Sequence, residues 1–352
     1  MKMMLLEDCC EILDSMRVPI TAADRQRGPY PYYGANGIQD HVAEYIFDDE
    51  LVLLAEDGGN FGSKTRPIAY RVSGKCWVNN HAHVLKPKEG LDVDFLCYSL
   101  MFYNTDGLVN GATRQKLTQA TMRKMLIPKL EITEQRAIVE LINQVIEIKE
   151  KRVAELTKLE ELIKARFVEL FGDPVLNSLG WEKKRFDSLC ENFDGRRKPI
   201  TSTDRVEGPY PYYGASGVVD HVADYIFDED ILLVSEDGAN LLARSTPIAF
   251  SVSGRVWVNN HAHVVKFDDF ALQKYVEYYF AMISIEDYVT GSTQPKLNQA
   301  KLNGIMIPIP EKERIDCYLD FIKQVDKSKA VVQKSLDETQ VLFDSLMQKY
   351  FG

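Results

Sequence analysis

Two histidines placed two residues apart belong to the most concentrated polar segment of the sequence, Asn79–His83. On a β-strand, residues two apart point to the same face, so His81 and His83 are expected to lie together. Such a pair could bind a metal ion if two further ligands joined it. The candidates for these ligands are Glu56, Asp57 and His41.

Two other roles are open for the same segment. In the first, one histidine is packed in the core and the other is hydrogen-bonded. In the second, Asn79, Asn80 and His81 contact a nucleic acid, because asparagine can read adenine with two hydrogen bonds and both residue types reach phosphates.

Three further segments carry side chains that could bind a ligand. Gly58–Thr65 resembles a phosphate-binding loop, but the Walker pattern requires glycine directly before the lysine, where Ser63 stands. Gly28–Gly37 is an aromatic, proline-stiffened loop that either seals the core or forms a surface platform. Gly111–Thr118 offers short polar and basic groups for phosphates, or simply a helix cap.

All of these segments occur twice, at a constant offset of 180 residues. Gly28–Ala35 is identical to Gly208–Ala215, and Trp77–Val84 is identical to Trp257–Val264. The six histidines follow the same offset. A period of this length is far beyond that of a solenoid and indicates a duplicated domain with a duplicated connector.

The copies differ most where the first has Gly58–Thr65, because the second lacks those glycines. Variable loops on a shared scaffold are where recognition is usually tuned. We therefore predict DNA contacts in both copies, in the four segments described above and directly after Gly58–Thr65. The predicted contact residues are Tyr32, Tyr33, Asn60, Lys64, Arg66, Asn79, Asn80, His81, Thr113 and Lys116, and Tyr212, Tyr213, Asn240, Arg244, Asn259, Asn260, His261, Thr293 and Lys296.

The elements that must position these side chains are of two kinds. Residues 17–110 are rich in β-branched and aromatic residues with turn signals, which predicts a mostly β domain with some helix. Thr133–Phe171 then lacks Gly and Pro and keeps a seven-residue hydrophobic repeat, as does its counterpart in the second copy. A sustained period of 3.5 residues is typical of a coiled coil. The predicted seam residues are Ile142, Val145, Leu156, Leu159, Ile163, Ile322, Val325, Leu336, Phe343 and Leu346.

These patterns predict an α+β protein in which two pseudo-repeated α/β recognition domains are joined by two long helices that form an antiparallel coiled coil. An amphipathic helix packed on its own domain is the alternative for each long helix. We expect recognition domains at 1–112 and 181–292, a helical connector with a linker at 113–180, and a second connector at 293–352.

Composition limits the possible classes of protein. The chain has 352 residues, 45% hydrophobic and 27% charged, which is typical of a globular protein. There is no apolar run of membrane-spanning length, no signal-peptide pattern and no CxxC pair among the six cysteines, so we expect a cytoplasmic protein. A net charge of −10 argues against strong DNA binding by the chain alone.

The order of motifs resembles that of specificity (S) subunits of type I restriction-modification systems, over essentially the whole chain. The resemblance rests on a Gly-x-Thr-x-x-x-Leu segment, then Ile127-Pro128, then Glu134-Gln135-Arg136 opening a long helix that ends in Phe171-Gly172. The second copy departs from this order, since Glu311–Arg314 matches the Glu-Gln-Arg run poorly. The recognition domains are also compact for the family.

This resemblance implies a non-catalytic subunit that reads double-stranded DNA. Each recognition domain would read one half of a bipartite target, and the paired helices would bind two methyltransferase (M) subunits, to which restriction (R) subunits can add. S-adenosylmethionine, Mg²⁺ and ATP would belong to the partner subunits, and no cofactor or metal is expected on this chain. The alternative from another class is a metal-dependent hydrolase or nuclease with duplicated sites built on His41, His81, His83 and Glu56.

Overall fold

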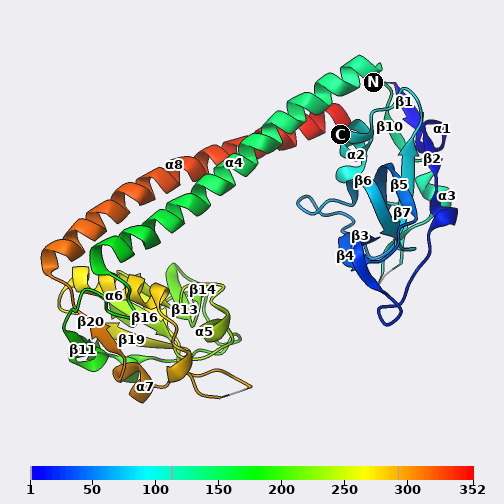
Figure 1. The fold of residues 1–352 in the computed structure, drawn as a ribbon. Helices are drawn as coiled ribbons and strands as arrows, with labels where there is room; N and C mark the ends of the chain where they lie inside the picture. The colour runs from blue at the N-terminus through cyan, green and yellow to red at the C-terminus, as the bar shows by residue number, and fades with distance from the viewer. Residues whose placement is uncertain (1, 112–113, 292) are drawn as a thin grey trace. The chain divides into compact units, whose positions relative to one another are not determined.

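The structure is a computed structural model that describes residues 2–111, 114–291 and 293–352. The chain divides into two compact units, one made of Met1–Ala154 with Gln333–Gly352 and the other of Glu155–Val332. Each unit holds one copy of the repeat and parts of both long helices, α4 (Ile132–Phe171) and α8 (Lys312–Phe351) (Figure 1). Among the described residues, no helix combines the length and hydrophobicity needed to cross a membrane.

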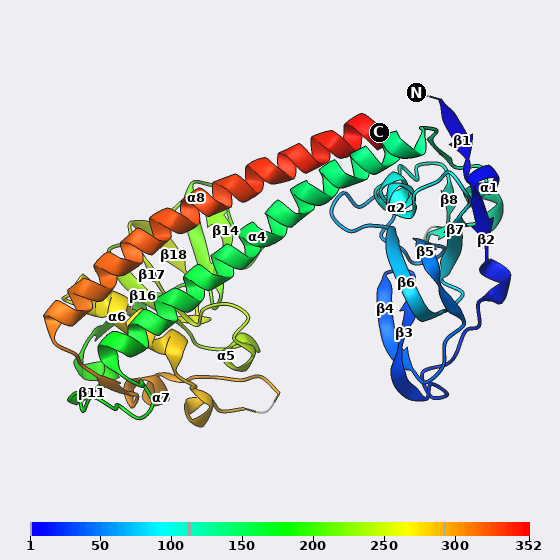
Figure 2. The same cartoon turned by 45° about the horizontal axis from the view of Figure 1, so that its top comes forward.

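A six-stranded sheet forms the centre of the first unit, in the order β2-β7-β5-β6-β3-β4. Neighbouring strands are antiparallel, except that β3 and β6 are parallel. Figure 2 shows β3 to β7 with α2 at one end of the sheet. The strands are β2 (Cys10–Ile12), β3 (Arg27–Gly34), β4 (Gly37–Val42), β5 (Phe47–Ala55), β6 (Ala69–Val78) and β7 (Ala82–Pro87).

Short elements complete this unit. Strand β1 pairs with β10 and β8 pairs with β9. Their bounds, with those of the short helices, are β1 (Met3–Leu5), α1 (Leu6–Cys9), the 3₁₀ helix η1 (Asp14–Met16), α2 (Val93–Met101), β8 (Val109–Asn110), β9 (Lys116–Leu117), α3 (Gln119–Met122) and β10 (Leu126–Pro128).

The second unit repeats this design with the sheet divided into two four-stranded parts, β12-β19-β16-β17 and β14-β13-β18-β15. The counterpart of β6 is interrupted near Gly254, whose φ is +79°, and Gly74 has a φ of +75° at the equivalent point. The backbone therefore bends at the same place in both copies.

The strands of the second unit are β11 (Lys183–Arg185), β12 (Glu191–Asn192), β13 (Tyr210–Gly214), β14 (Gly217–Val222), β15 (Phe227–Asp228), β16 (Ile231–Ser235), β17 (Ala249–Val252), β18 (Arg255–Val258), β19 (Ala262–Lys266) and β20 (Met306–Pro308). The helices are η2 (Phe186–Ser188), η3 (Asp194–Arg196), α5 (Asn240–Ala243), α6 (Phe270–Met282), η4 (Glu286–Tyr288) and α7 (Gln299–Asn303).

Strand β5 is buried on both faces and thereby joins two cores of the first unit. Val52 and Leu54 belong to the cluster that includes α2 and the long helices, whereas Leu51 and Leu53 belong to a second cluster on the other face. This alternation follows from the two-residue period of a strand. Strand β5 is therefore a rigid base for the loop that follows it.

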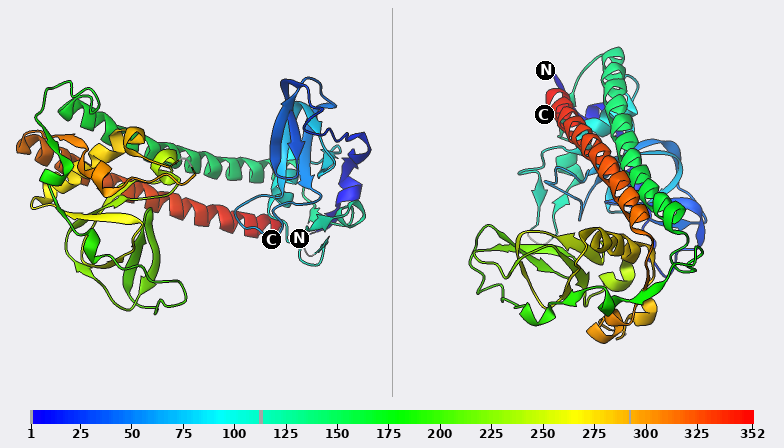
Figure 3. Two further views of the ribbon diagram at one scale, coloured as in Figure 1. Left: turned by 90° about the horizontal axis from the view of Figure 1, so that it is seen from below. Right: turned by 90° about the vertical axis from the view of Figure 1, so that its left-hand side faces the viewer.

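Within each unit, α4 and α8 pair in opposite directions, which confirms the predicted antiparallel pairing. In the first unit, Ile142 of α4 belongs to one core cluster with Phe343 of α8. In the second, Ile163 belongs to one cluster with Ile322. Figure 3 shows the start of α4 and the end of α8 running side by side in the first unit.

All ten predicted seam residues have little solvent exposure. The buried ones are Ile142, Val145, Ile163, Ile322, Val325 and Phe343, and the half-buried ones are Leu156, Leu159, Leu336 and Leu346. Two lysines in the seam find polar partners: Lys149 donates to Gln340, and Lys329 pairs with Glu160. The seam is therefore apolar apart from two lysines that have polar partners on the other helix. Such polar pairs favour one register of the two helices over others.

The start of α4 is fixed to the recognition domain by Gln135, which is fully buried. Its side-chain amide donates to the carbonyls of Gly90 and Leu130, and its carbonyl oxygen accepts from the backbone of Asp92. Asp92 in turn caps α2. The Glu134-Gln135-Arg136 motif thus couples the long helix to the segment between β7 and α2 through a buried amide.

Candidate functional site

The predicted segments converge at the end of β5 in the first unit. The backbone N–H of Glu56 donates to the carbonyl of His81, and its carbonyl accepts from Leu117. Asn36 donates to the carbonyl of Gly58, which ties the β3–β4 turn to the same place. Four segments far apart in the sequence therefore form one surface.

A buried ion pair lies beneath this surface. The Nδ1 atom of His83 lies 2.7 Å from Oδ2 of Asp14, and Nε2 lies 2.9 Å from the carbonyl oxygen of Leu117. Burial by itself raises the pKa of Asp14. This effect is outweighed by the hydrogen bond and charge of His83 and by hydrogen bonds from the N–H of Val84 and the amide of Gln119, so the pKa of Asp14 lies below its usual value. Asp14 is therefore ionised, and the ring of His83 joins it to the backbone of Leu117.

A second layer of charge lies directly above it. Glu56 contacts Arg17 at 2.6 Å and Lys116 at 2.9 Å. Burial raises the pKa of Glu56, but hydrogen bonds from Arg17 and Lys116 and the charge of His83 hold it below its usual value. One network therefore joins β5, β7, η1 and β9 through the side chains of Arg17, Lys116, Asp14, Glu56 and His83.

This network does not fit the metal-site alternative. Asp14, Glu56 and His83 do place ligand atoms within 4.8 Å of one another. However, the Nε2 atom of His83 must carry a proton, because a carbonyl oxygen can only accept, and the carboxylates already face two cations. His41 lies elsewhere, in a hollow of about 470 Å³ lined with Arg25. The contacts that these side chains already make among the described residues therefore do not favour a metal-dependent hydrolase.

The exposed part of the surface centres on Asp57. Its Oδ1 atom lies 2.6 Å from Nδ1 of His81 and 2.7 Å from Nη2 of Arg114. The backbone N–H of His81 donates to the buried amide of Asn79. Asn79 therefore positions the half-buried His81. Asp57 holds the exposed side chain of Arg114 in place.

The second copy repeats the network. His263 contacts Asp194 at 2.6 Å and the carbonyl of Leu297 at 2.8 Å, while Arg197 contacts Glu236 at 2.6 Å. Lys296 contacts Glu236 at 3.0 Å. The shared sequence therefore builds the same rigid frame twice.

Four predicted contact residues are buried, and the structure does not support them as contacts. The ring of Tyr32 is only 1% exposed, and its hydroxyl bonds the backbone of Ile20; Tyr212 does the same with Ile200. Asn79 and Asn259 are buried and accept the N–H of His81 and His261. The aromatic loops therefore seal the core with Tyr32 and Tyr212. The guanidinium groups of Arg25 and Arg205 lie over these two rings.

Most of the other predicted residues do reach the surface. Tyr33 and Tyr213 are half-buried against Tyr70 and Phe250, and Asn60 and Asn240 brace their own loops through Pro67 and Thr246. Thr113 lies outside the described residues. The remaining nine predicted residues are exposed or half-buried, and they lie at the convergent surfaces or on neighbouring loops: Lys64, Arg66, Asn80, His81, Lys116, Asn260, His261, Thr293 and Lys296.

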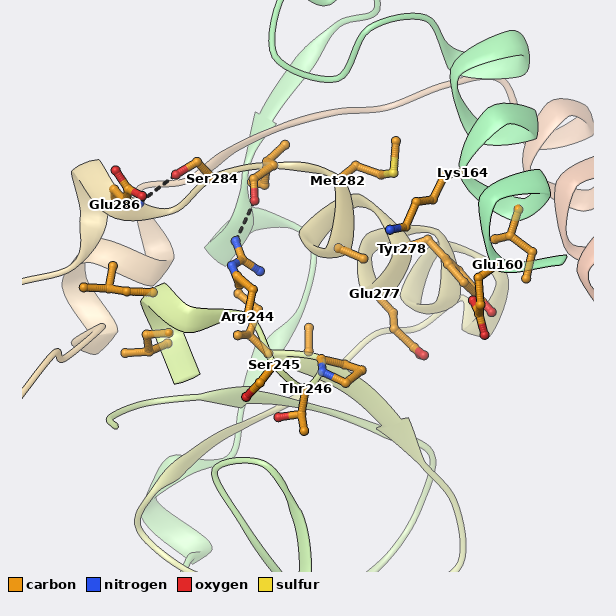
Figure 4. Close-up of a pocket in the computed structure, with 18 of the residues that line it drawn as sticks. Glu160, Lys164, Arg244, Ser245, Thr246, Glu277, Tyr278, Met282, Ser284 and Glu286 are labelled. Atoms are coloured by element: carbon orange, nitrogen blue, oxygen red, sulfur yellow. Dashed lines mark hydrogen bonds between the residues drawn. The ribbon is translucent and has the colours of Figure 1, made fainter. Parts of the chain in front are cut away.

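Arg244 has a structural role instead. It adopts a left-handed conformation and donates to the carbonyls of Phe280 and Ile283 at the end of α6, at 3.1 and 2.5 Å. Arg244 lines a cavity of about 800 Å³, whose lining residues are drawn in Figure 4, and burial lowers the pKa of Arg244. Its counterpart Lys64 is exposed in the first copy, so the loops differ in form as predicted.

The sequence interpretation missed Asp14 and Arg17, with Asp194 and Arg197, as well as Arg114. A usable signal was present, because an Asp and an Arg three residues apart recur at the 180-residue offset. Their partners lie far along the chain, so only the fold shows their role.

The ion-pair network predicts acid sensitivity. Four carboxyl groups have a folded-state pKa below the unfolded value of about 4, namely those of Asp14, Asp194, Glu56 and Glu236. Their contribution to stability is therefore complete above the unfolded pKa, and it is lost as the pH falls through the lowered folded-state pKa values. Melting temperatures measured between pH 7 and 3 should be nearly constant to about pH 5 and then fall steeply. The double variant E56Q/E236Q should show a shallower fall, and an equal slope would contradict this origin.

Comparison with known proteins adds independent information. A family model described as the type I restriction modification DNA specificity domain matches residues 1–158 and 178–339. The chain is 28% identical over 354 residues to a protein of Haemophilus influenzae provisionally named type I restriction enzyme specificity subunit S.HindORF215P, covering 92% of this chain and 88% of that protein.

Solved structures share the fold. The S subunit of a type I restriction-modification system from M. genitalium matches with a TM-score of 0.56 at 15% identity, over 100% of this chain and 96% of that one. A chain from a structure on complex assembly and conformational transition of the type I R-M system matches with a TM-score of 0.61 at 15% identity, over 99% and 97%.

Proposed function

The chain belongs to the type I restriction-modification DNA specificity family, and from this premise we propose that each copy reads one half of a bipartite double-stranded DNA target. The observation that carries this proposal is the duplicated frame, in which the same charged network supports the same convergent loops in both units. Rigid elements under exposed polar loops are what sequence readout requires.

The two halves of the target are expected to be similar, and the whole near-palindromic with a non-specific spacer. Similar domains arranged as an inverted repeat read similar sequences on opposite strands.

The chemistry is assigned to partner subunits. We propose that two methyltransferase subunits bind the helical connectors, that restriction subunits can add to the assembly, and that S-adenosylmethionine, Mg²⁺ and ATP are bound by those partners. The buried carboxylates of Glu56 and Asp14 are already paired with Arg17 and His83, which supports a non-catalytic role for this chain. Its net charge of −10 favours partners that clamp the duplex.

Sequencing of methylated bases in the host tests this function. We expect a bipartite motif with two related halves, which disappears when the gene for this chain is deleted and returns with the wild-type gene. An asymmetric motif with unrelated halves would contradict the predicted symmetry. An unchanged methylation pattern after deletion would contradict the function itself.

A further inference from the structure

Position 114 differs between two surfaces that share the same charged frame. The first copy has Arg114 and the second has Gln294 at the same offset of 180 residues. Both side chains are exposed. The residues two positions later, Lys116 and Lys296, are identical and make the same ion pair.

The backbone around this position is the same in both copies. Gly58 donates to the carbonyl of Gln115 at 3.1 Å, and Gly238 donates to that of Pro295 at 3.0 Å. Gly111 and Gly291 both have positive φ, +105° and +86°. A Cβ at either glycine would lie within 2.6 Å of the carbonyl oxygen of residue 114 or 294, so glycine is required in both turns. The two side chains therefore leave equivalent points of the frame.

Arg114 is held in place while most of it faces solvent. Its Nη2 atom lies 2.7 Å from Oδ1 of Asp57 and 3.3 Å from Nδ1 of His81. The guanidinium also lies over Gly58, where an added Cβ would come within 3.3 Å of Nε. The side chain is nevertheless 60% exposed. A charged group that is oriented by a carboxylate but open to solvent is preorganised to bind a ligand.

Arginine and glutamine at equivalent points have different base preferences. The guanidinium pairs with O6 and N7 of guanine, whereas the glutamine amide pairs with N6 and N7 of adenine. Resting on the function proposed above, we propose that Arg114 and Gln294 are specificity-determining residues that read equivalent positions of the two half-sites, with a G·C pair facing Arg114 and an A·T pair facing Gln294. The two half-sites are then unequal at the position that these two residues read.

Exchange of the two residues tests this proposal in a strain that carries the full chain and its own methyltransferase. Sequencing of methylated bases should show that R114Q changes one position of the first half-site from G·C to A·T, and that Q294R makes the reverse change in the second. Each exchange should alter the preference at its position roughly 10- to 100-fold. The untouched half-site of each variant is the internal control. R185Q is the matched control and should keep the wild-type motif, because Arg185 is 57% exposed and paired with a carboxylate, Asp187, like Arg114.

The outcomes separate this proposal from the proposed function. The proposal stands if at least one exchange alters one base-pair position in its own half-site and no other. It falls if neither does so, including the case in which R114Q lowers methylation equally at all sites, as expected of a phosphate contact. In that case the function still stands, provided that deletion of the gene abolishes methylation.

Discussion

Replacement of Asp14 by alanine is expected to lower the free energy of unfolding of the first unit by about 3–5 kcal/mol. The variant leaves the Nδ1 atom of the fully buried His83 ring without the carboxylate that it contacts, while the other ring nitrogen still contacts the carbonyl oxygen of Leu117. It also removes the acceptor of the Val84 backbone N–H. Breaking a buried pair in this way costs far more than the pair contributes in net stability.

Denaturant unfolding with hydrogen exchange resolved by segment would measure this loss. Protection should fall in η1, β7 and β9, which the pair connects. The equivalent variant D194A should have a similar effect in the second unit, since His263 is bound in the same way. D106A, at an exposed turn, is the control and should change stability by less than about 0.5 kcal/mol. A loss below about 1 kcal/mol in D14A would mean that the pair is not closed in solution.

Replacement of Ile142 by aspartate is expected to separate α4 from α8 in the first unit and to abolish sequence-specific methylation. Ile142 is fully buried in a cluster with Phe343 and Met347 of α8 and Phe95 of α2. An unpaired carboxylate there should cost about 4 kcal/mol or more, since both the apolar contacts and the solvation of the charge are lost.

The control for this variant introduces the same residue two positions away. Gln144 lies on the exposed side of α4, so Q144D should retain the stability of the helix pair. Circular dichroism melting and sequencing of methylated bases would compare the two variants. Normal methylation by a stably folded I142D protein would contradict the view that the helix pair must be intact for function.

Much of the architecture can be read from the sequence because it is encoded by periodicity and repetition. The 180-residue offset identifies the two copies, and the seven-residue repeat identifies seam residues such as Ile142 and Phe343. Both signals are local or translational, so they survive without knowledge of the fold. The turn at Gly58 and the divergence of its loop could be predicted for the same reason.

The candidate contact surface was predictable only in part. The sequence places His81 and Asn80 in a polar segment but does not distinguish exposed from buried members, so Tyr32 and Asn79 were expected at the surface and lie in the core. Aromatic and amide side chains suit both environments, and hydrogen bonds with distant backbone decide between them.

What the sequence alone determined is the presence of two matched recognition domains, their long helical connectors and their family resemblance. What only the tertiary structure decided is which charges meet. Asp14 and His83 are 69 residues apart, and Arg114 is 57 residues from Asp57. Their pairing depends on loops brought together by the sheet, and side-chain charge interacts over a few ångströms of space whatever the separation along the chain.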